Sequence, residues 1–120
     1  VTQLSEAVRL HPKHREARLG LAAALRAQGK GAEALALLEA LVTEGPSDSA
    51  PHFNLCILHQ ETLDRPDEAT EACERFLALA PDHVRAAEAR RRITVIRDMQ
   101  EMMRLMEEER QGTPEAVEDP

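Results

Sequence analysis

The sequence predicts an all-α fold made of repeated helix pairs, for three reasons. Alanine, leucine, arginine and glutamate, which all favour helices, dominate the 120 residues. No segment alternates β-branched and polar residues in the way that strands do. Apolar helical runs end at Pro12, Pro46 and Pro81, so that the successive prolines are 34 and then 35 residues apart. A period of this length indicates a stack of two-helix units.

The repeat extends to side chains between the prolines. The extra residue of the second interval fits best in the turn at residues 63–65, where an insertion costs least. With the gap placed there, small or apolar residues coincide at five sites: Leu21 with Leu55, Ala22 with Cys56, Ala34 with Ala69, Leu38 with Cys73, and Leu41 with Phe76.

The first complete unit covers residues 13–46. We expect its first helix to run from Arg15 to about Gln28, where Gly29 and Gly31 interrupt the pattern. Glycine is a common helix stop because it tolerates the backbone conformation that ends a helix. The return helix is expected from residue 32 to about residue 43.

The second unit covers residues 47–81. Ser47 or Asp48 is expected to cap a helix that accepts Pro51 in its first turn and runs to about residue 63. Pro66 begins the partner helix, which ends before Pro81. The acidic residues that follow Pro66 favour the positive end of the helix dipole.

The flanking segments complete the expected organisation. Residues 1–12 have the pattern of a second helix from a truncated preceding unit. Residues 82–111 form one long helix, which we expect to cap the stack with a polar outer face. Gly112 and Pro114 end it, and residues 112–120 are an acidic tail that is flexible or depends on a partner for its structure.

The period near 34, the small residues, the alanine early in each second helix and the closing proline resemble the tetratricopeptide repeat over residues 13–81. The resemblance implies a right-handed α-α superhelix whose first helices line a concave groove that binds peptides. The usual aromatic sites of the family differ here: Arg18 and His52 hold the tryptophan site, and Leu25 and His59 hold the tyrosine site.

The composition argues against two classes of partner, nucleic acid and the membrane interior. The net charge of −7 argues against nucleic acid, because neutralising phosphates requires a basic surface. No segment approaches the roughly 20 apolar residues that span a bilayer, so we expect no membrane insertion. Two cysteines do not fix the compartment. We favour the cytoplasm over the periplasm.

Two histidines and two cysteines form a candidate metal constellation. His52, Cys56 and His59 follow one face of a helix, and Cys73 lies at a facing site of the partner helix. The set could hold zinc, the cysteines could form a disulfide, or all four could pack between helices. Because all four occupy sites that pack in this repeat type, we expect ordinary packing, without a metal or another cofactor.

The candidate binding surface is the groove that the resemblance implies. We expect an apolar floor with a cationic edge, and Phe53 as the anchor for a partner segment that has one or two aliphatic side chains to bury and acidic groups nearby. The alternative is that Phe53 packs between neighbouring helices. The predicted groove residues are Leu19, Ala23, Arg26, Phe53, Asn54, Ile57, Gln60, Arg85 and Arg92.

Some members of the family clamp the C-terminal carboxylate of a partner with lysine, asparagine and arginine. Asn54 and Arg85 match two of the clamp sites. Leu19, Ala23 and Ala89 occupy the others and cannot hold a carboxylate. We therefore do not expect binding of that kind.

The last helix carries an apolar stripe with a spacing of three or four residues. Three interpretations stay open: the stripe lies back over the repeats, pairs with a second copy, or docks a partner helix. Ile93 and Ile96 begin it, and Met102 and Leu105 widen it. The candidate interface residues are Ile96, Met99, Met102, Met103 and Met106.

The sequence contains no nucleophile elbow, phosphate loop or paired carboxylates that would indicate catalysis. The predicted function is therefore a non-catalytic protein–protein interaction module, whose partner is another protein or a peptide segment. The alternative is a structural element that assembles as a homodimer through its methionine-rich helix.

Overall fold

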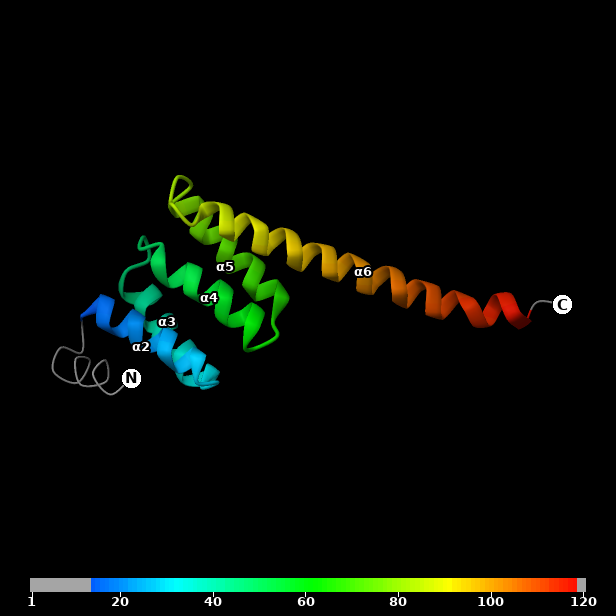
Figure 1. Cartoon of the computed structure of the whole chain (residues 1–120), viewed down its shortest axis with the longest axis horizontal. Helices are drawn as coiled ribbons and strands as arrows, with labels where there is room; N and C mark the ends of the chain where they lie inside the picture. Colours follow the sequence, from blue (N-terminus) through cyan, green and yellow to red (C-terminus); the bar gives the residue numbers. More distant parts are fainter. Residues whose placement is uncertain (1–13, 119–120) are drawn as a thin grey trace.

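The computed structural model describes residues 14–118 of the chain. Helices and no strands form within this range, which confirms the all-α expectation (Figure 1). The described part measures 74 × 30 × 21 Å because the last helix projects beyond the others (Figure 1). The expected helix in residues 1–12 lies outside the described residues. The helices are α2 (Arg15–Ala27), α3 (Gly31–Glu44), α4 (Ala50–Glu61), α5 (Pro66–Leu79) and α6 (Ala86–Glu118).

Burial follows the repeat register. The core lies between successive helices in two clusters, one shared by α2, α3 and α4, and one shared by α4, α5 and α6. Equivalent residues of the two units are equally buried, which agrees with the alignment on the prolines. None of the following exceeds 2% exposure: Ala22 and Cys56, Ala34 and Ala69, Leu38 and Cys73, Leu41 and Phe76.

The turns explain why one interval is a residue longer. Residues 28–30 join α2 to α3, with Gly29 at φ 80° and the N–H of Lys30 donating to the Leu25 carbonyl at 2.8 Å. This arrangement is a Schellman motif, in which glycine takes the left-handed conformation. Residues 62–65 join α4 to α5, and Asp64 takes a positive φ of 52° there. The extra residue therefore lies in this turn, as the alignment predicts.

Proline begins both helices of the second unit. Pro51 lies in the first turn of α4, and Pro66 is the first residue of α5. The cap of α4 differs from the expectation of Ser47 or Asp48, because Ser49 is the N-cap residue. Asp48 still contributes, since its Oδ1 accepts a hydrogen bond from the Ala50 N–H at 3.2 Å.

The bounds of α6 differ from the expected 82–111. Turns occupy the residues after Pro81, where the N–H of Arg85 donates to His83 Nδ1 at 3.0 Å, so that Asp82 does not cap the helix. At the other end, α6 continues through Gly112 and Pro114 to Glu118, past the expected start of the acidic tail. Both residues lower helix stability, but each does so locally, and here the helix continues through them. None of the described helices is long and apolar enough to cross a membrane.

Candidate functional site

Phe53 is buried rather than presented to a partner. Its exposed fraction is 3%, and its ring centroid lies 4.9 Å from that of Phe76 on α5. The guanidinium carbon of Arg85 lies over the same ring, 4.8 Å from its centroid. The expectation of Phe53 as an accessible anchor is therefore wrong, because α5 and the segment that leads into α6 cover the ring.

The expected cationic edge is neutralised by acidic residues. Glu61 bridges the first helices of the stack, with its carboxylate 2.7 Å from Arg92 Nη1 and 3.9 Å from Arg26 Nη1. Arg92 also donates to Gln60 Oε1 at 2.7 Å and forms an ion pair with Glu88 at 3.1 Å. The structure thus brings the predicted Arg26, Gln60 and Arg92 together, but as a closed network.

Glu61 and Glu88 are the residues that the sequence analysis missed in this network. The repeat gives no signal for Glu61, since the equivalent residue 34 positions earlier is Ala27. Glu88 could have been found, because it lies four residues before Arg92 on the same helix, a spacing that favours ion pairs.

The other predicted groove residues are at most partly accessible, apart from Arg85. Leu19 and Ala23 are half-buried, and Ile57 is only 8% exposed. Asn54 donates its side-chain N–H to the Ala50 carbonyl at 3.0 Å, within its own helix. Partner binding at this face stays a prediction, with Leu19 and Ala23 as its more accessible apolar side chains.

The two cysteines form a disulfide between α4 and α5. The Cα atoms of Cys56 and Cys73 are 5.2 Å apart, within the range that a disulfide requires. The expectation of ordinary packing is wrong for this pair, because facing sites on adjacent antiparallel helices bring the two Cβ atoms together. No group of three His, Cys, Asp or Glu side chains in residues 14–118 is arranged to hold a metal ion.

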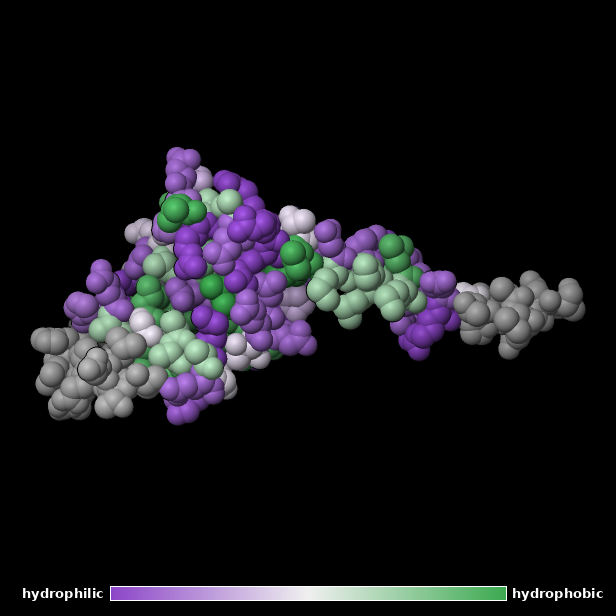
Figure 2. Space-filling view, in the orientation of Figure 1, coloured by the Kyte–Doolittle hydropathy of each residue, from purple (hydrophilic) through white to green (hydrophobic). Residues whose placement is uncertain are grey.

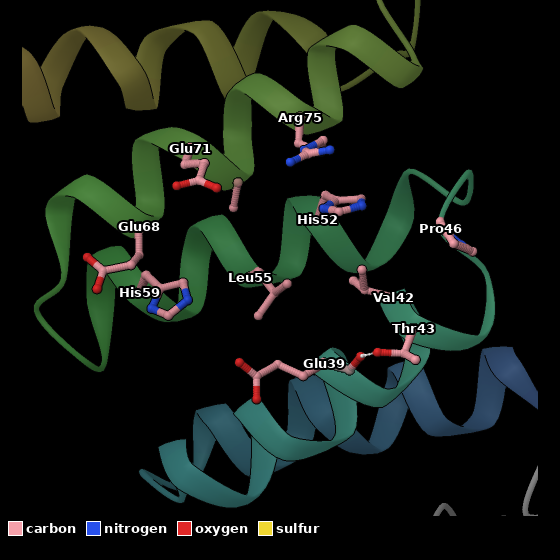
Figure 3. A pocket seen from close by; sticks show the side chains of 11 residues that line it. Glu39, Val42, Thr43, Pro46, His52, Leu55, His59, Glu68, Glu71 and Arg75 are labelled. Atoms are coloured by element: carbon pink, nitrogen blue, oxygen red, sulfur yellow. Dashed lines mark hydrogen bonds between the residues drawn. The ribbon is translucent and has the colours of Figure 1, made fainter.

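The two histidines do not join the cysteines in a shared site, because they line a cavity while the cysteines bond to each other. His52 and His59 are each 8% exposed and line a cavity bounded by α3 and α5 (Figure 3). Burial of each imidazole lowers its pKa, since desolvation disfavours the charged form. His52 Nε2 and His59 Nδ1 have no hydrogen-bond partner among the described residues.

Most of the exposed large apolar side chains among the described residues lie on α6. Ile93 and Ile96 pack against α5 and are buried, but the side chains that follow are not. Figure 2 shows apolar side chains gathered where α6 projects beyond the other helices. The stripe does not lie back over the repeats. Its exposed residues, called the α6 stripe below, are Val95 (49%), Met99 (59%), Met102 (62%), Met103 (65%), Leu105 (52%) and Met106 (61%).

Charges on α6 divide along its length. Residues 85–97 contain five arginines and one glutamate, a net charge of +4. Residues 98–110 contain five acidic residues and two arginines, a net charge of −3. In the second half, arginines pair within the helix, as Arg104 does with Glu101 and Glu108. The side chain of Arg91 is exposed and forms no ion pair with a described residue.

Comparisons with known proteins agree with this architecture. A family model described as the tetratricopeptide repeat matches residues 1–49. No curated protein matches the chain in sequence. A solved structure described as "MamA RS-1 ArsTM double mutant" superposes on 82% of the chain with a TM-score of 0.58 and 22% sequence identity. The chain covers 65% of that structure's length, and at this identity the likeness shows the fold alone.

The match to the tetratricopeptide repeat model over residues 1–49 and the helical-repeat fold together indicate a protein–protein interaction module. Nothing in the described residues points to an enzyme. The α6 stripe, the inner face of the first helices and the cavity beside the histidines are the surfaces through which such a module could act.

Proposed function

We propose that the chain is an interaction module that assembles with a second copy of itself through the α6 stripe, the two α6 helices lying antiparallel. One observation carries the proposal: large apolar side chains lie on one face of a projecting helix, and their exposed fractions are between 49% and 65%. Exposed apolar area of this kind marks interaction surfaces in soluble proteins.

The spacing within the stripe suits a helix partner. Val95, Met99, Met102 and Met106 follow one another at intervals of four, three and four residues. This spacing places the side chains along a single seam, as in paired helices. Methionine also adapts its shape to a neighbouring surface.

Charge favours a second copy over an unrelated helix, and an antiparallel arrangement over a parallel one. Antiparallel pairing sets the basic first part of α6, residues 86–97, against the acidic part that follows it, residues 98–110, of the other copy. Parallel pairing would set like charges against each other. The antiparallel pair has two-fold symmetry, so each copy contributes the same surface.

Paired variants test this assembly by sedimentation velocity. Met99→Glu with Met103→Glu places two carboxylates in the seam, and we expect the associated species to disappear. The matched control is Leu79→Glu with Val84→Glu, two exposed apolar residues outside the α6 stripe, which we expect to associate like the unmodified chain. Circular dichroism checks that both variants remain helical. Unchanged association of the Met99→Glu, Met103→Glu variant would contradict the proposal.

Partner binding at the inner face is a second candidate. A cavity of about 280 Å³ beside Leu19, between α2 and the start of α4, supports it. Two variants distinguish self-association through the α6 stripe from partner binding at the inner face. Leu19→Glu would weaken binding of a partner at the inner face, whereas Met99→Glu with Met103→Glu would leave that binding intact.

A further inference from the structure

A groove between α3 and α5 lies apart from both the α6 stripe and the inner face. Both helices pack on α4, and α4 forms the floor between them (Figure 3). His52, Leu55 and His59 of α4 line this floor at intervals of three and four residues. The cavity above them has a volume of about 640 Å³. We call it the α3–α5 groove.

The floor contains polar atoms without partners. His52 Nε2 and His59 Nδ1 are buried and make no hydrogen bond within the described chain. A buried polar atom left without a partner costs about 1–3 kcal/mol, so a ligand that supplies the missing bond gains affinity. A neutral imidazole has one ring nitrogen that can accept a hydrogen bond, so a donor on a ligand can bond to either ring.

The walls of the groove are acidic at one end. Glu39 of α3 and Glu68 and Glu71 of α5 line it near His59, and all three side chains are exposed (Figure 3). None of the three carboxylates forms an ion pair with a described residue. Arg75 is the single basic residue among those that line the groove, and it lies beside His52 at the other end (Figure 3). The end at His59 therefore has an unbalanced negative charge.

The middle of the groove is apolar. Leu55 on the floor, Val42 on the α3 wall and Ala72 on the α5 wall line this part. A ligand that suits the whole groove has a cationic hydrogen-bond donor at one end of an aliphatic stem. Arginine meets both needs, because its five donors fit carboxylates and its methylene stem packs on apolar surface.

We propose that the α3–α5 groove binds an arginine side chain of a partner protein, with the guanidinium between Glu39 and Glu68 and above His59. The stem lies along Leu55 and Val42 towards His52. The site is independent of self-association, since no residue of the α6 stripe lines the groove. The module would thus recognise a basic segment of a partner while α6 joins two copies.

Nuclear magnetic resonance of the ¹⁵N-labelled chain tests this site. The probe is an acetylated and amidated heptapeptide, Gly-Ala-Ala-Arg-Ala-Ala-Gly. We expect it to shift backbone signals of α3, α4 and α5 around the groove and the side-chain signals of His52 and His59. A matching peptide with citrulline in place of arginine keeps the shape without the charge, and we expect it to bind at least tenfold more weakly.

Variants locate the contact. We expect Glu39→Gln with Glu68→Gln to weaken peptide binding about tenfold or more, because two charge-assisted hydrogen bonds are lost. The matched control is Glu33→Gln with Asp64→Asn, which changes the net charge equally at exposed residues outside the groove. We expect this control and the Met99→Glu, Met103→Glu variant to bind like the unmodified chain.

Four results with the two peptides would overturn the proposal. The first two are signal shifts that cluster away from the groove, and a citrulline peptide that binds as tightly as the arginine peptide. The other two are equal losses of peptide affinity in the Glu39→Gln, Glu68→Gln variant and its control, and loss of peptide binding in the Met99→Glu, Met103→Glu variant. Spermidine is the test for a small free cation. Binding of spermidine at the groove without binding of the arginine peptide would overturn the assignment to a partner protein.

Discussion

At the scale of single residues, the polar side chains inside the stack set this chain apart from the family pattern. Equivalent sites of the two units hold Arg18 and His52, where the tetratricopeptide repeat that the sequence resembles has tryptophan, and both are less than 10% exposed. Arg18 is accommodated by two hydrogen bonds to Glu44, at 2.7 and 2.9 Å, and this pairing raises its pKa. His52 lines a cavity instead. Equivalent sites of the two units can thus hold side chains of different chemical type, an arginine and a histidine, while the helices keep the same repeat register.

The buried histidines predict how stability depends on pH. Burial lowers the folded-state pKa of His52 and His59 below the ordinary value of 6.5. As the pH falls below about 6.5, the unfolded chain therefore binds protons before the folded chain does, and the free energy of unfolding decreases. The decrease ends once the pH is below the lowered pKa values.

Urea unfolding from pH 8 to pH 5 measures this dependence. We expect the His52→Gln, His59→Gln variant to lose less stability over this range than the unmodified chain. An identical loss in both proteins would show that other groups cause the pH dependence.

The disulfide predicts a second effect at this scale. Cys56 and Cys73 are 17 residues apart, and cross-linking a loop of this size stabilises a protein by about 3 kcal/mol. We expect Cys56→Ala with Cys73→Ala to lower the free energy of unfolding by about that amount, measured by urea titration. A loss of well under 1 kcal/mol would mean that packing of α4 on α5 suffices without the bond.

At the scale of elements, the sequence predicted the helices of both units well, because prolines and glycines mark their ends. Pro51, Pro66 and Gly29 lie where the pattern places them. Helix α6 was predicted less well: the turn at His83 delays its start, and Gly112 does not end it. The register also shows which face Phe53 occupies, but not that α5 and Arg85 cover it. Such cover depends on how neighbouring helices pack, which spacing along one helix does not encode.

The antiparallel arrangement of α6 makes an element-scale prediction. Gly112 lies near the exposed end of α6 with open space around its Cα. In an antiparallel pair the two Gly112 residues lie at opposite ends, so we expect Gly112→Cys to form no disulfide between copies under mild oxidation. The native cysteines do not interfere, because they are bonded to each other. Rapid cross-linking of the variant into a covalent dimer would instead support parallel pairing.

At the scale of the whole molecule, the chain combines a compact stack with a projecting helix (Figure 1). Two internal clusters stabilise the stack, and the first part of α6 closes the second cluster with Ala89 and Ile93. The rest of α6 lacks a covering element in residues 14–118 and exposes its stripe. Figure 2 shows this division between the body and the projecting arm. The shape favours assembly through α6 and leaves the α3–α5 groove of each copy free.

The most direct test of assembly through α6 is the mass and maximum dimension of the chain in solution, measured together by light scattering and small-angle X-ray scattering over a concentration series. We predict that the mass rises from 13.3 kDa towards twice that value, and that the maximum dimension exceeds the 74 Å length of one copy. A constant mass of 13.3 kDa at every concentration would contradict the account.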